Sequence, residues 1–203
     1  MNILVVGSGA REHAIVRAIE RSPKDKEIFC LGSNVNPGIA ELCADLTVAN
    51  INDIHTITSY AKKRAVDLAI IGPEKPLAIG AADALWDMDV RVVGPRKDLA
   101  QIETSKAFTR DLLTEYNISA CPKYKTFSSL GGVVEFLSEL GENFVVKYDG
   151  LAGGKGVKVS GDHLHSHDDA KIYCQELVEK GGVFVLEEKL IGQEFSLMSF
   201  CDG

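Results

Sequence analysis

The amino-acid sequence predicts an α/β protein in which a doubly wound parallel sheet is followed by a separate α+β segment. Two observations predict the sheet. Short runs of Val, Ile and Leu are apolar at nearly every position, as in strands buried on both faces, and amphipathic stretches separate them. A third observation predicts the α+β segment, because from Lys123 onward the pattern changes to strands and helices around a glycine-rich loop.

In the first part, strands are expected at Asn2–Val6, Glu27–Leu31, Asp45–Val48, Asp67–Ile71 and Val90–Val93. Helices are expected at Glu12–Arg21, Ile54–Arg64 and Leu77–Met88, the second with Asp53 as its N-cap. Because strands and helices alternate, the strands are expected to run parallel. A longer helix is expected at about Asp98–Tyr116. Asp98 and Gln101 there have the spacing of a capping box.

In the second part, the expected elements are strand Tyr124–Phe127, helix Ser129–Leu140, strands Phe144–Tyr148 and Val157–Val159, a helix to Glu179, and strands Val183–Glu187 and Glu194–Phe200. Ser166 or Asp168 is expected to cap the helix that ends at Glu179. Cys201-Asp202-Gly203 is a turn signal directly after an expected strand. We therefore expect the chain to be a fragment of a longer protein.

Composition excludes several classes of protein. Hydrophobic residues make up 45% and charged residues 25%, which is ordinary for a globular chain. The net charge of −7 argues against a general nucleic-acid binder. No apolar run approaches the ~20 residues that cross a bilayer, and the first residues lack the features of a secretory signal. The five scattered cysteines form no C-x-x-C pair, so we expect reduced thiols in a cytoplasmic protein.

The first motif is Gly7-Ser8-Gly9-Ala10-Arg11-Glu12, where a strand turns into a helix. Backbone N–H groups and the helix dipole favour an anion there, and Arg11 adds a charged donor. A dinucleotide fingerprint is disfavoured, because Glu12 stands in place of the third glycine. Gly32-Ser33 also follows the second strand where an acidic residue would hold a ribose.

Three unusual loops follow strands of the predicted sheet: Gly7–Glu12, Asn34–Gly38 and Gly72–Leu77. Ligands of open α/β sheets bind beyond the carboxyl ends of the strands, so these loops should share one edge and form one pocket. Glu74 can accept hydrogen bonds from a sugar or an amine. The alternative for each single loop is ordinary Pro/Gly turn chemistry.

The most specific motif runs from Lys147 to Val157 and contains four glycines within seven residues. Free backbone N–H groups with Lys147 and Lys155 suit a triphosphate. It is not a Walker A loop, because Gly156 replaces Ser or Thr and a strand follows instead of a helix. We interpret it as a flap over nucleotide phosphates. The alternative is a flexible hairpin with solvated lysines.

Two further segments are ambiguous. Leu186–Glu194 can offer backbone groups to adenine and the Glu194 carboxylate to a ribose, but alone it cannot be told from an acidic turn. His163, His165 and His167 have the spacing of a metal site, yet they stand in a polar segment before a helix. We interpret them as part of a solvated loop.

Taken together, these stretches resemble the phosphoribosylamine–glycine ligase family of the ATP-grasp superfamily. The matching segments occur in the family's order and spacing: Val5–His13, Asn36–Gly38, Gly72–Leu77, Glu103–Phe108, Val146–Val157 and Glu187–Ser196. The resemblance implies a pre-ATP-grasp sheet and an ATP-grasp subdomain truncated at its C-terminus. It also implies the boundaries: a substrate-binding domain at 1–102, a connecting helix and linker at 103–122, a small subdomain at 123–187 and the start of a larger one at 188–203.

The resemblance implies the ligation of glycine to 5-phosphoribosylamine at the expense of ATP, through a glycyl phosphate, in purine synthesis. It assigns no catalytic residue with certainty in this chain. The residues that it implies for ATP are Lys106 and Lys147 on the phosphates, Gly150, Gly153, Gly154, Lys155 and Gly156 in the flap, Glu187 and Leu190 on adenine, and Glu194 on the ribose. For phosphoribosylamine they are Gly9, Arg11, Glu12, Asn36, Gly38, Pro73 and Glu74.

The resemblance also implies Mg²⁺ or Mn²⁺, with ligands expected beyond residue 203 and none in this chain. We therefore expect this chain alone to be inactive, a monomer whose partners are ATP, glycine and phosphoribosylamine. Two alternatives stay open: another ATP-grasp enzyme of the purine pathway, or a non-catalytic nucleotide-binding protein. A dinucleotide-dependent dehydrogenase is a more distant alternative.

Overall fold

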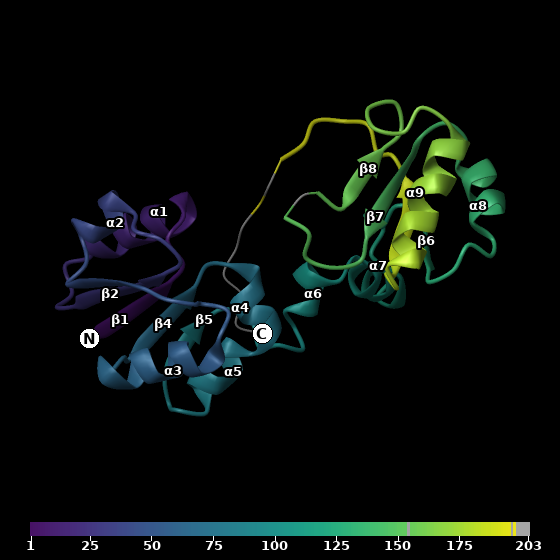
Figure 1. Ribbon diagram of the computed structural model, residues 1–203. Coiled ribbons are helices and arrows are strands. Elements are labelled where there is room, and N and C mark those ends of the chain that lie inside the picture. Colours follow the sequence, from purple (N-terminus) through teal and green to yellow (C-terminus); the bar gives the residue numbers. More distant parts are fainter. Residues whose placement is uncertain (154, 196, 198–203) are drawn as a thin grey trace. The chain divides into compact units, whose positions relative to one another are not determined.

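The computed structural model divides the chain into two compact units, Met1–Ser105 and Lys106–Gly203. Figure 1 shows the helices and strands of both units. The structure describes residues 1–153, 155–195 and 197. Among these residues, no helix is both long enough and apolar enough to span a bilayer.

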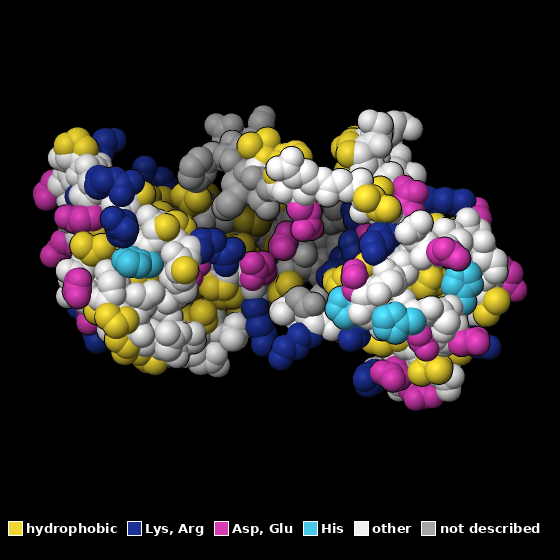
Figure 2. Space-filling view, turned by 90° about the horizontal axis from the view of Figure 1, so that it is seen from above, with side chains coloured by type: hydrophobic (Ala, Val, Ile, Leu, Met, Phe, Trp, Pro, Cys, Tyr) yellow, Lys and Arg dark blue, Asp and Glu magenta, His cyan; other side chains and the backbone are white. Residues whose placement is uncertain are grey.

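The described cysteines all carry free thiols; they are Cys30, Cys43, Cys121 and Cys174. On the face seen in Figure 2, Lys and Arg side chains lie among Asp and Glu side chains.

The first unit is built on a five-stranded parallel sheet with the order β3-β2-β1-β4-β5. The strands are β1 (Asn2–Val6), β2 (Glu27–Gly32), β3 (Asp45–Val48), β4 (Leu68–Ile71) and β5 (Arg91–Val93). Along β1, Leu4 and Val6 pack into one apolar cluster, and Val5 packs into another on the opposite face. This alternation is the period of two that a strand imposes. The predicted doubly wound sheet is confirmed.

Helices cover both faces of this sheet. The described helices of this unit are α1 (Ala10–Glu20), α2 (Pro37–Ala40), α3 (Ile54–Lys63), α4 (Glu74–Ile79), α5 (Ala81–Trp86) and α6 (Gln101–Thr104). Figure 1 shows α1 and α2 on one side and α3 and α5 on the other. Asp53 caps α3, as predicted, by accepting hydrogen bonds from the backbone of His55 and Thr56.

Two helices that were predicted to be continuous are each divided into two in the structure. The stretch Leu77–Met88 is divided into α4 and α5, because Gly80 adopts a left-handed conformation at φ +97°. The stretch Asp98–Tyr116 is divided at Ser105, whose backbone is extended. The predicted capping box is wrong as well, since the Gln101 amide donates to the Asp98 carbonyl oxygen at 3.0 Å. The helix α2 was not predicted; the Asn36 side chain caps it.

The second unit is built on a four-stranded antiparallel sheet with the order β6-β9-β7-β8. Its strands are β6 (Tyr124–Phe127), β7 (Phe144–Tyr148), β8 (Val157–Val159) and β9 (Phe184–Glu188), and its helices are α7 (Lys106–Glu115), α8 (Val133–Leu140) and α9 (His167–Glu179). Ser166 caps α9, which agrees with one of the two predicted caps. The predicted strand Glu194–Phe200 is wrong at 194, 195 and 197; its other positions lie outside the described residues.

The two faces of this sheet differ in character. Phe144 and Val146 of β7 and Phe184 and Leu186 of β9 belong to an apolar core with residues of α8 and α9. The intervening residues, which include Lys147 and Glu187, therefore lie on the opposite face. That face receives α7, and it carries the charged side chains described below.

Candidate functional site

In the first unit, the strand order places a crevice beside β1. β2 and β3 lie on one side of β1, whereas β4 and β5 lie on the other. The loops after β1 and β4 therefore flank a topological switch point, which is where ligands of open α/β sheets bind. The Arg11 guanidinium donates to Glu74 Oε1 at 3.3 Å, and the Asn36 amide donates to the Ser8 carbonyl oxygen at 3.1 Å. The structure thus brings the three predicted loops together.

Glu12 lies at the centre of this arrangement and is only 3% exposed. Its carboxylate accepts hydrogen bonds from the Gly9 backbone N–H at 2.7 Å and from Arg11 Nε at 3.0 Å. A Cβ atom on Gly72 would lie 2.0 Å from Glu12 Oε1, and one on Gly7 would lie 2.8 Å from its Cγ. Glu12 therefore fills the space between two glycine turns and holds the loops in place.

The rim of this site is polar and accessible. The side chains of Arg11 and Glu74 are 47% and 41% exposed. A hydrogen bond with Glu12 raises the pKa of Arg11, and Glu74 contributes in the same direction against a lowering by burial. Gly9 stands at the N-terminus of the 11-residue helix α1, and Pro73 stands at that of α4. The site therefore suits a small polar ligand that carries a phosphate. Arg11 and the N-terminus of α1 can bind the phosphate, and the carboxylate and amide groups can bind other polar atoms of the ligand.

Gly38 serves a packing role that the motif did not show. A Cβ atom there would lie 2.4 Å from Cε1 of His13, so the glycine lets α2 approach the histidine of α1. His13 ends the matching segment Val5–His13, but the sequence assigns it no role. No signal in the sequence reveals the contact, because it depends on how two helices separated by the strand β2 pack together.

In the second unit, three charged side chains from three elements meet on the sheet face that α7 covers. Glu187 of β9 has a side chain that is 5% exposed. Arg110 Nε of α7 lies 2.7 Å from Glu187 Oε2, and Lys147 Nζ of β7 contacts Glu187 Oε1. Burial raises the pKa of the Glu187 carboxyl, but hydrogen bonds and charges from Arg110 and Lys147 outweigh burial and hold that pKa below its ordinary value.

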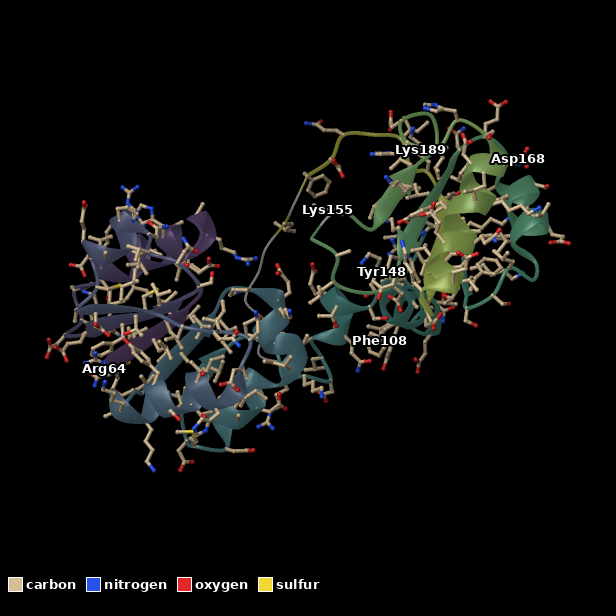
Figure 3. All side chains as sticks on the ribbon, viewed as in Figure 1. Arg64, Phe108, Tyr148, Lys155, Asp168 and Lys189 are labelled. Carbon is tan, nitrogen blue, oxygen red and sulfur yellow. The ribbon has the colours of Figure 1, made fainter. Side chains whose placement is uncertain are left out.

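The glycine-rich loop joins β7 to β8 as a hairpin. The Tyr148 N–H donates to the Gly156 carbonyl oxygen at 2.8 Å, which closes the base of the loop. Gly150 and Gly153 have φ values of +152° and +55°, which side chains disfavour. Figure 3 labels Tyr148 at the end of β7 and Lys155 within the loop. Gly154 lies outside the described residues.

Lys106 is tied to the start of this loop. Its ammonium donates to the Gly150 carbonyl oxygen at 3.0 Å. The backbone N–H groups of Lys106 and Ala107 donate to Asp149 Oδ1 at 2.6 and 3.2 Å, so Asp149 caps the N-terminus of α7 across space. Sequence reasoning missed Asp149 as well as Arg110. Asp149 lies within the glycine-rich motif, whereas Arg110 lies outside every motif, and the partners of both are about 40 or more residues away.

The residues expected around adenine and ribose lie near the end of β9. Glu187 pairs with both Tyr124 and Val145, so its backbone is part of the sheet ladder. Leu190 is 68% exposed beyond the strand. Glu194 is also exposed, and it forms no hydrogen bond or ion pair with the described residues. Their predicted contacts with a nucleotide stay predictions.

The described residues assemble no group of three or more His, Cys, Asp or Glu side chains that could hold a metal ion. In the histidine segment, Nδ1 of His163 accepts from the Val159 N–H at 3.3 Å, and Nε2 of His167 lies 2.8 Å from the Gly141 carbonyl oxygen. His163 and His167 therefore have different hydrogen-bond partners. A cavity of about 590 Å³ lies beside His165 and His167, away from Lys147.

Comparison with known proteins shows the family. Residues 1–103 match the model of the phosphoribosylglycinamide synthetase N domain, and residues 104–203 match that of its ATP-grasp (A) domain. The chain is 45% identical over its whole length to a phosphoribosylamine–glycine ligase of Methanosarcina barkeri, and 48% identical to one of Methanococcus vannielii. It spans 46% and 47% of the length of these curated relatives.

Solved structures show the fold. A phosphoribosylamine–glycine ligase of Thermotoga maritima is 22% identical over 95% of this chain and 45% of its own, with a TM-score of 0.74. An N5-carboxyaminoimidazole ribonucleotide synthetase in complex with ADP is 20% identical over 94% of this chain and 47% of its own, with a TM-score of 0.70. With both of its units matched by the corresponding family models, the chain belongs to the phosphoribosylglycinamide synthetase family.

Proposed function

We propose that this chain takes part in the ATP-dependent ligation of glycine to 5-phosphoribosylamine, which gives glycinamide ribonucleotide, ADP and phosphate in purine synthesis. In this proposal the second unit binds ATP, the first unit binds phosphoribosylamine, and the protein acts as a cytoplasmic monomer. The observation that carries the proposal is the glycine-rich hairpin, in which Lys106 donates a hydrogen bond to the Gly150 carbonyl oxygen and Lys147 lies on the first strand. The names and identities of the relatives support it.

The chemistry proceeds in two steps. A glycine carboxylate oxygen attacks the γ-phosphorus of ATP, and the bond from that phosphorus to the ADP oxygen breaks. The amine of phosphoribosylamine then attacks the carbonyl carbon of the glycyl phosphate, phosphate leaves, and the nitrogen loses a proton. Lys106, Lys147 and Lys155 are proposed to stabilise the charge on the phosphates, and the loop Gly150–Gly156 to exclude water from the acyl phosphate.

The same proposal assigns adenine to the backbone of Glu187 and Leu190 and the ribose to Glu194. Phosphoribosylamine is assigned to the site around Arg11, Asn36 and Glu74. Mg²⁺ or Mn²⁺ would supply further charge neutralisation on ATP. Because the described residues assemble no metal site, we assign no metal ligand and no step through a metal to this chain.

We expect Lys106→Gln to weaken ATP binding by roughly 10-fold, because it removes one charge-assisted contact to a phosphate. The backbone N–H of residue 106 remains, so the cap that Asp149 provides to α7 is kept. Isothermal titration of ATP into both proteins measures the effect, and Lys171→Gln, at an exposed lysine of α9, is the matched control. Binding is the readout because the chain spans about half of its relatives. Wild-type chain that binds no ATP would contradict the proposal.

We expect Arg11→Gln to weaken the binding of ribose 5-phosphate, a stable stand-in for phosphoribosylamine, by roughly 10-fold. The guanidinium stands at the rim of the site on α1, held by Glu12 and Glu74. Arg17→Gln removes the same charge from an exposed position of the same helix and should leave binding unchanged. Equal losses in the two variants would show that only general charge matters and would remove Arg11 from the site.

A further inference from the structure

We propose that Arg110, a residue outside every motif of the sequence, is a positioning residue for nucleotide binding. It acts through Glu187 on Lys147, and it need not touch the nucleotide. This inference rests on the proposed function, because it concerns the same ATP site. Its basis is the ion cluster of Arg110, Glu187 and Lys147, which joins α7, β9 and β7 on one face of the antiparallel sheet.

The geometry gives each carboxylate oxygen its own cation. Arg110 Nε lies 2.7 Å from Glu187 Oε2, and Lys147 Nζ contacts Oε1. The side chains of Arg110, Glu187 and Lys147 are 19%, 5% and 23% exposed. Arg110 therefore sets the orientation of a carboxylate that is almost wholly buried, and that carboxylate sets the position of the ammonium group. Lys147 keeps accessible surface through which an anion can approach it.

The charge of the cluster explains why the arginine matters for a phosphate. Two cations and one carboxylate leave a net charge of +1. Without Arg110, Lys147 and Glu187 would form a neutral pair, and an incoming phosphate would compete with an unshared carboxylate for the ammonium group. A buried carboxylate with only one partner also binds that partner more strongly, because little water is present to screen it. Because Arg110 shares the Glu187 carboxylate, that carboxylate neutralises Lys147 less completely, and Lys147 attracts a phosphate more strongly.

Arg110 also links the two lysines that are proposed to contact phosphates. Lys106 begins α7 and Arg110 follows four residues later, so the two side chains lie on the same side of the helix. The bond from Arg110 to Glu187 ties this helix to the strand beside Lys147. An arginine suits the role, because its planar guanidinium keeps its charge and directs its N–H groups.

The test compares ligands with and without phosphates on the wild-type chain, Arg110→Gln and Arg110→Lys. Isothermal titration measures the affinities for ATP and for adenosine. We expect Arg110→Gln to weaken ATP binding by roughly 10-fold or more and to leave adenosine binding unchanged. Arg110→Lys, which keeps the charge but not the direction of Nε, should show a smaller loss for ATP only. Lys123→Gln, which breaks an exposed ion pair with Glu139 in the same unit, is the matched control.

The outcomes separate the two proposals. Equal losses for ATP and adenosine would mean that Arg110 only supports the fold, which overturns the positioning role. Unchanged ATP binding in Arg110→Gln overturns it as well. If Arg110→Gln does not fold, Arg110→Lys still decides, because positioning requires a loss confined to ATP. If the wild-type chain binds adenosine and ATP equally or not at all, the proposed function fails and this inference fails with it.

Discussion

Replacing Glu187 with alanine should lower the free energy of unfolding of the second unit by about 3–5 kcal/mol, the range measured when one partner of a buried ion pair is removed. The Glu187 side chain is 5% exposed, and its carboxylate forms ion pairs with both Arg110 and Lys147. Without it, the partly buried cations of Arg110 and Lys147 are left with no carboxylate between them. Glu187→Gln should be less severe, because the amide oxygen can still accept one hydrogen bond.

The two units allow this effect to be located. The sequence contains one tryptophan, and Trp86 lies in the first unit. In urea, far-ultraviolet circular dichroism reports both units, whereas tryptophan fluorescence reports the first. Glu187→Ala should shift the circular dichroism transition and leave the fluorescence transition in place. Glu139→Ala, at an exposed ion pair with Lys123, should change neither. A fluorescence shift as large as the circular dichroism shift would contradict the assignment of the effect to the second unit.

The same carboxylate predicts a pH dependence. The pKa of Glu187 is lowered in the folded state from its ordinary value of 4.5. The unfolded chain therefore binds the proton more readily, and the stability that Glu187 contributes is complete above pH 4.5 and decreases as the pH falls toward the folded value. The stability difference between wild type and Glu187→Gln should narrow on going from neutral pH to about pH 4 or below. A difference that stays constant over this range would show that the charge of Glu187 does not matter.

The second large effect is expected from Gly72→Ala in the first unit. The new Cβ atom would lie 2.0 Å from Glu12 Oε1, so Glu12 must move. Glu12 is buried and holds the Gly9 N–H and Arg11, so its movement disturbs the loops that follow β1 and β4. We expect a loss of about 1–3 kcal/mol, as for other overpacked sites, together with weaker binding of ribose 5-phosphate.

A double-mutant cycle tests the cause. In Glu12→Ala, the side chain that blocks the new methyl group is absent, so adding Gly72→Ala should cost much less than it does in the wild type. Unfolding followed by the fluorescence of Trp86 gives the four free energies, because that tryptophan belongs to the same unit. Strictly additive losses would show that Gly72→Ala acts on the backbone rather than through Glu12.

The sequence by itself determined much about this protein, wherever the deciding interactions are local. Apolar runs such as Asn2–Val6 predict buried parallel strands, and the caps Asp53 and Ser166 predict where helices begin. The apolar runs on both sides of the glycine-rich loop predict the strands β7 and β8 with the bounds that the structure has. Each of these features depends on residues within a few positions of one another, so the local pattern carries enough information.

Only the tertiary structure decided which side chains meet across the fold. The break at Ser105 and the left-handed Gly80 interrupt helices whose local pattern is continuous. The burial of Glu12 against Gly72 depends on the neighbouring strands β1 and β4. The contacts of Glu187 with Arg110 and Lys147 join a helix to two strands from distant parts of the chain. Periodicity and motif spacing cannot show such contacts, because they depend on the three-dimensional packing of whole elements.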